Sequence, residues 1–166
     1  MKRMLAFMAV GLLTMPSLGC FGKTAVNTTP KPIESTTAEY GKKISDTVRA
    51  AQTAVHGVGT ASESLVVKKG ALAALQGLDK VNLVGIDLAD VLNKIAAVRA
   101  AGQPVTGDLL AQAQALIDKI DVAIDLDVIP HLGDNPEVKA GLDAVRAISK
   151  LALEIQLYLG QLKGGA

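Results

Sequence analysis

The chain has 166 residues, the length of one domain, and its 17 lysines and arginines nearly balance its 16 aspartates and glutamates. A nucleic-acid-binding protein usually has a basic excess and aromatic side chains that stack on bases, but aromatic residues make up only 2% of this chain. Composition therefore excludes the common nucleic-acid-binding classes. The hydrophobic fraction is 49%, and alanine, leucine, valine and isoleucine supply most of it, which favours closely packed helices.

The first twenty residues have the pattern of a secretory signal. Lys2 and Arg3 provide a positive start, residues 4–13 are apolar, and smaller residues follow as far as Cys20. The apolar run is well short of the roughly 20 residues that a membrane-spanning helix needs. The sequence therefore predicts a leader at 1–20 and an exported protein.

The leader ends in Ser17-Leu18-Gly19-Cys20, and Cys20 is the only cysteine of the chain. This tetrapeptide resembles the lipobox of bacterial lipoproteins, in which a peptidase cuts before a cysteine that carries lipid. Gly19 and Cys20 match the lipobox, whereas Ser17 stands where the family usually has leucine. The resemblance implies that Cys20 is lipidated and that the protein is anchored in the cell envelope, facing the periplasm or the surface.

Other fates of the same leader stay open. Ser17 and Gly19 are small residues at the two positions that an ordinary signal peptidase recognises, so cleavage there would release a secreted chain with an unmodified Cys20. An uncleaved leader would instead hold the protein at a membrane. A single cysteine cannot form an intramolecular disulfide, so acylation explains Cys20 best, with a dimer-forming thiol as the second explanation.

Beyond the leader, the sequence predicts a linker and one helical domain. Residues 21–35 contain Pro30 and Pro32 and show no hydrophobic period, which indicates an extended, semi-rigid linker. Residues 36–166 show helical periods throughout, and no strand-like alternation competes with them. We therefore expect an all-α domain: an antiparallel up-down bundle of four helices with short connections.

Caps and breakers give the expected bounds of the first two helices. The first begins near Thr36, which has Glu39 at capping-box spacing, and ends near Gly70 or continues as far as a break at Gly77. The second covers 79–101, and Gly102 is expected to end it in a left-handed cap. The first helix has an apolar seam with a period near 3.5 residues. Its members are Tyr40, Ile44, Val48, Ala51, Val55, Val58, Ser62 and Leu65.

The last two helices are expected around a turn at 131–134. The third begins at Thr106 and stops at Ile129, because the residue before Pro130 avoids helical geometry. The fourth begins at Asn135, with Pro136 in its first position, and ends near 162. The broad apolar stripes of these helices are expected to fill a common core, although a stripe of this kind could also bind a partner helix.

Residues that could form a chemical site are few and scattered. Asp118, Asp121, Asp125 and Asp127 form the densest acidic group, but the Glu-x-x-His pairs of helical metal sites are absent, so a solvated face is expected. His56 and His131 are isolated from other metal-ligating residues in the sequence. The segment ending in Lys23-Thr24 lacks the first glycine of a phosphate-binding loop. We predict no catalytic, cofactor or metal site, and a protein that is not an enzyme.

The sequence thus predicts a lipid-anchored envelope protein with a structural or protein-interaction role. The alternatives are a bundle that binds a small apolar ligand and a bundle held by an uncleaved N-terminal anchor. The expected partners are a membrane, through the N-terminal lipid or leader, and either another protein or a second copy, through helical seams. No nucleic acid partner is expected.

Overall fold

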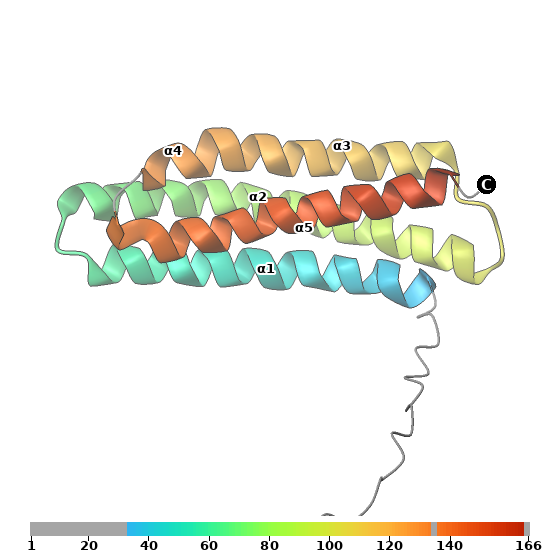
Figure 1. Ribbon diagram of the computed structural model, residues 1–166, viewed down its shortest axis with the longest axis horizontal. Coiled ribbons are helices and arrows are strands. Elements are labelled where there is room, and N and C mark those ends of the chain that lie inside the picture. The colour runs from blue at the N-terminus through green and yellow to red at the C-terminus, as the bar shows by residue number, and fades with distance from the viewer. Residues whose placement is uncertain (1–32, 134–135, 165–166) are drawn as a thin grey trace, which may run out of the picture.

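The computed structural model describes residues 33–133 and 136–164, which form a bundle of long helices (Figure 1). Helix α3 (Gly107–Ala123), the π-helix η1 (Ile124–Val128) and helix α4 (Ile129–Leu132) follow one another without interruption. They form one continuous helical rod from 107 to 132, which we call the third rod, and α1, α2 and α5 are the other three rods of the bundle. The described residues contain no strand, and the all-α prediction is confirmed. The elements are α1 (Ile33–Ala61), α2 (Leu65–Ala100), α3 (Gly107–Ala123), the π-helix η1 (Ile124–Val128), α4 (Ile129–Leu132), the 3-10 helix η2 (Pro136–Val138) and α5 (Lys139–Gly164).

The rods have up-down topology, as the sequence predicts. Helix α1 contacts α2 and α5, and α3 contacts the same two helices, so α1 and α3 lie across the bundle from each other (Figure 1). One end of the bundle contains the start of α1 and the connection from α2 to α3. The other end contains the turn from α1 to α2 and the connection into α5.

The core is one cluster of buried aliphatic side chains from all four rods. The predicted seam of α1 faces it from Ile44 to Ser62, while Tyr40 is half-buried. Leu65 is the exception and is 64% exposed, because it begins the next helix. The largest side chains with no exposed surface are Ile44, Leu78, Leu88, Leu92, Ile95, Ile117, Ile120, Ile124, Ile148 and Ile155. Each such side chain stabilises the fold by roughly 1.5–3 kcal/mol relative to an exposed position.

The predicted boundary between the first two helices is wrong. Helix α1 ends at Ala61, and α2 begins at Leu65 after a three-residue turn. The Ser64 side chain caps α2 by accepting a hydrogen bond from the backbone N–H of Val67 at 3.5 Å. Helix α2 then continues through Gly70 and Gly77, where the sequence predicts a helix end or a break.

These two glycines allow the backbone of α2 to come into direct contact with the backbone of the third rod. A Cβ atom added at Gly77 would lie 2.8 Å from the carbonyl carbon of Asp127 and would collide with that carbonyl oxygen. A Cβ atom at Gly70 would collide with the carbonyl oxygen of His131 in the same way. The two glycines are seven positions apart, which is close to two helical turns, so they lie on one face of α2. They are contact positions within a helix rather than helix breakers.

The predicted stop at Ile129 is also wrong, because the third rod passes through Pro130. Proline has no N–H to bond the carbonyl four residues earlier, and its ring collides with that carbonyl in an α-helix. The chain widens into the π-helix η1 just before this point, and the N–H of Ile129 bonds the carbonyl of Ile124, five residues back. The rod ends at Gly133, whose φ of 62° lies in the left-handed region.

The remaining ends agree more closely with the sequence. Gly102 takes the predicted left-handed conformation at φ 68°, and its N–H bonds the carbonyl of Arg99. Thr106 caps α3 by accepting from the N–H of Leu109. Helix α1 begins at Ile33, three residues before the predicted start at Thr36, so the end of the expected linker is helical. Asn135, the expected cap of the last helix, lies outside the described residues.

A test of the close approach is to replace Gly77 by alanine. The new methyl group would push α2 away from η1, and we expect a loss of about 1–3 kcal/mol in the free energy of unfolding. Gly57→Ala is the matched control, since nothing lies within 4 Å of the added Cβ and alanine favours a helix by about 1 kcal/mol. Urea unfolding followed by circular dichroism measures both changes. Equal stability of the two variants would show that the contact does not constrain α2.

Candidate functional site

Cys20, the one residue to which the sequence assigns a role, lies outside the described residues, as do the leader and residues 21–32. The described side chains that could form a site therefore all belong to the bundle. None of the described helices is both long and apolar enough to cross a membrane.

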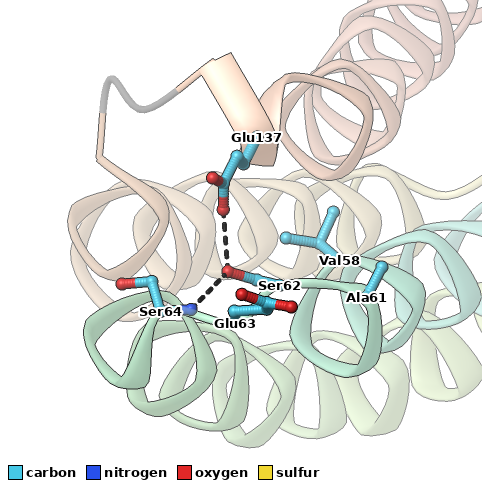
Figure 2. Close-up of a pocket in the computed structure, with 6 residues that line it drawn as sticks. All are labelled: Val58, Ala61, Ser62, Glu63, Ser64 and Glu137. Atoms are coloured by element: carbon cyan, nitrogen blue, oxygen red, sulfur yellow. Dashed lines mark hydrogen bonds between the residues drawn. The ribbon is translucent and has the colours of Figure 1, made fainter.

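A hollow of about 520 Å³ opens where α1 turns into α2 (Figure 2). Ser62 at its base is only 8% exposed, and its hydroxyl donates to Glu137 Oε2 at 2.7 Å. The same hydroxyl accepts a hydrogen bond from the N–H of Ser64 at 3.1 Å. Glu137 belongs to η2, so this polar tie holds the α1–α2 turn against the segment that leads into α5 (Figure 2).

The chemistry of this hollow favours a structural role. A nucleophilic serine needs a base that takes its proton and an orienting group behind that base. The residues that line the hollow include Glu63 and Glu137 but no histidine. Ser62 bridges a carboxylate and a backbone N–H, so its hydroxyl is engaged in closing the turn.

An aromatic tie joins α1 to α5 near the opposite end of the bundle. The rings of Tyr40 and Tyr158 lie 5.4 Å apart and are inclined by 46°, and the Thr37 and Tyr158 hydroxyls are hydrogen-bonded. The ammonium of Lys43 lies 5.3 Å from the centre of the Tyr40 ring, a distance typical of cation–π contacts. Burial, the charge of Glu154 and the neighbouring Tyr158 raise the pKa of Tyr40. The two tyrosines are far apart in sequence, so no local signal predicts their contact.

The acidic group of the third rod does not form one site. Asp127 is 2.9 Å from the ammonium of Lys80 on α2, while Asp118 accepts from Gln114 at 2.8 Å. Burial raises the pKa of Asp121, and the nearby charges of Asp125 and Asp118 raise it further. Within 33–133 and 136–164, no three histidine, cysteine, aspartate or glutamate residues gather closely enough to hold a metal ion.

The two histidines are separated and exposed. His56 lies on α1 in a shallow hollow with Asp79 of α2, and Gln52 there donates to Asp79 Oδ1 at 2.8 Å. His131 lies in α4 at the end of the bundle, where its carbonyl faces Gly70. Among the described residues, neither histidine belongs to a group of three or more side chains that could hold a metal ion.

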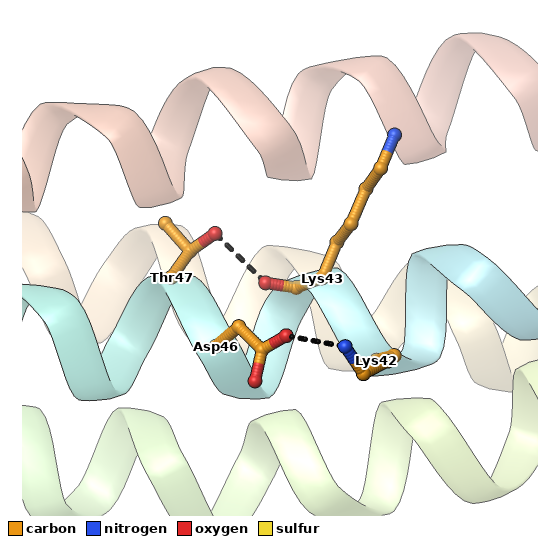
Figure 3. A network of polar contacts seen from close by, with 4 residues as sticks. All are labelled: Lys42, Lys43, Asp46 and Thr47. Atoms are coloured by element: carbon orange, nitrogen blue, oxygen red, sulfur yellow. Dashed lines mark hydrogen bonds and ion pairs between the residues drawn. The ribbon is translucent and has the colours of Figure 1, made fainter.

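The charged surface of α1 shows local contacts of the kind that stabilise a helix (Figure 3). Lys42 lies 3.2 Å from Asp46, one turn further along, and both side chains are more than half exposed. Thr47 donates to the backbone carbonyl of Lys43 at 2.7 Å. Exposed pairs of this type contribute at most about 1 kcal/mol, so this network is a solvated helix face.

Comparisons of the chain with protein-family models, with curated proteins and with solved structures give no match.

The polar tie at the α1–α2 turn can be tested with Ser62→Ala. This change removes the hydroxyl that joins Glu137 to the Ser64 N–H, and we expect the free energy of unfolding to fall by about 1–2 kcal/mol. Thr53→Ala is the control, because that exposed hydroxyl bonds only the Arg49 carbonyl of its own helix. Thermal unfolding by circular dichroism compares the two. A stability loss no larger than that of the control would contradict the structural role of Ser62.

A second prediction concerns pH. Since the pKa of Asp121 is raised in the folded protein, the folded state keeps the proton more readily than the unfolded chain. Stability therefore falls as pH rises from about 4 through the raised pKa, and it is lower by a constant amount above that range. Asp121→Asn removes this loss, so the variant should be more stable than the parent at pH 7 and similar to it near pH 3. Urea unfolding at a series of pH values measures the difference.

The control for this measurement is Asp108→Asn. Asp108 lies in the first turn of α3, where a negative charge is favourable to the helix dipole. Its replacement should lower stability slightly at pH 7, opposite in sign to the effect at Asp121. A gain of equal size at both positions would indicate a general charge effect rather than the local environment of Asp121.

Proposed function

We propose that the protein is an exported cell-envelope lipoprotein, held at a membrane through lipid on Cys20, with a structural or protein-interaction role. The observation that carries this proposal is the tetrapeptide Ser17-Leu18-Gly19-Cys20 at the end of a signal-like leader. Cys20 is the only cysteine, so it has no partner for an intramolecular disulfide.

The arrangement of the bundle supports attachment to a membrane through the chain that precedes α1. Helix α1 begins at one end of the bundle, so the chain that precedes it joins the domain at that end and not along its side (Figure 1). A tether there leaves the outer faces of α2, α3 and α5 accessible. The hollow at the Ser62–Glu137 tie lies at the far end from the tether.

The polar contacts of the bundle support a role without catalysis. The Ser62 hydroxyl closes a turn, Asp127 pairs with Lys80, and Tyr158 joins α5 to α1. Each of these polar groups binds another part of the fold. Within the described residues, the hollows at the α1–α2 turn and between α3 and α5 are lined by both polar and apolar groups.

Lipidation is tested by expressing the chain in a bacterium with lipoprotein-processing enzymes and labelling it with radioactive palmitate. We expect label in the parent chain and none in Cys20→Ala, which should also keep its leader. Mass spectrometry of the N-terminus then identifies the mature end. An unlabelled parent, or equal label in Cys20→Ala, would defeat the proposal.

Ser17→Leu distinguishes the two kinds of cleavage. Leucine at this position completes the resemblance to the lipobox, so lipidation and cleavage should proceed at least as fast as in the parent. An ordinary signal peptidase requires a small residue there, so the same change would block its cleavage. Accumulation of uncleaved Ser17→Leu chain would therefore favour plain secretion, and an intact leader in the parent would favour the uncleaved anchor.

A further inference from the structure

We draw no further inference here: the strongest candidate, the exposed aliphatic patch that Leu72, Leu83 and Ile86 form on the outer surface of α2, carries none because nothing in the described structure shows what covers it.

Discussion

The fold depends on how closely α2 approaches the third rod. At Gly70 and Gly77 the backbone of α2 lies against the carbonyl groups of His131 and Asp127, with no room for a side chain. Those carbonyls belong to the stretch in which the third rod widens to pass Pro130. The π-helix and the two glycines therefore belong to one contact, since the two carbonyl groups that the glycines admit lie within and just after the widened stretch.

This contact also explains which parts of the fold could be predicted from the sequence. Amphipathic periods depend on burial alone, so the seam from Ile44 to Ser62 and the bundle architecture follow from them. Gly102 and Thr106 act through their own backbone and side chain, so their cap roles are predictable too. Gly70 and Gly77 cannot be interpreted locally, because the same residue ends one helix and allows another to approach a neighbour. The carbonyl groups that decide between these roles belong to His131, 61 positions after Gly70, and to Asp127, 50 positions after Gly77.

In the candidate sites, too, the contacts between residues far apart in the chain could not be predicted from the sequence. The absence of a catalytic or metal site is inferred from the spacing of the histidines and aspartates in the sequence, and it stays a prediction. The polar tie between Ser62 and Glu137 and the aromatic tie between Tyr40 and Tyr158 both join residues far apart in the chain. Neither pair has a sequence signal, because its spacing depends on the three-dimensional arrangement of the rods. Together the two ties attach α5 and the segment before it to α1, one near each end of the bundle.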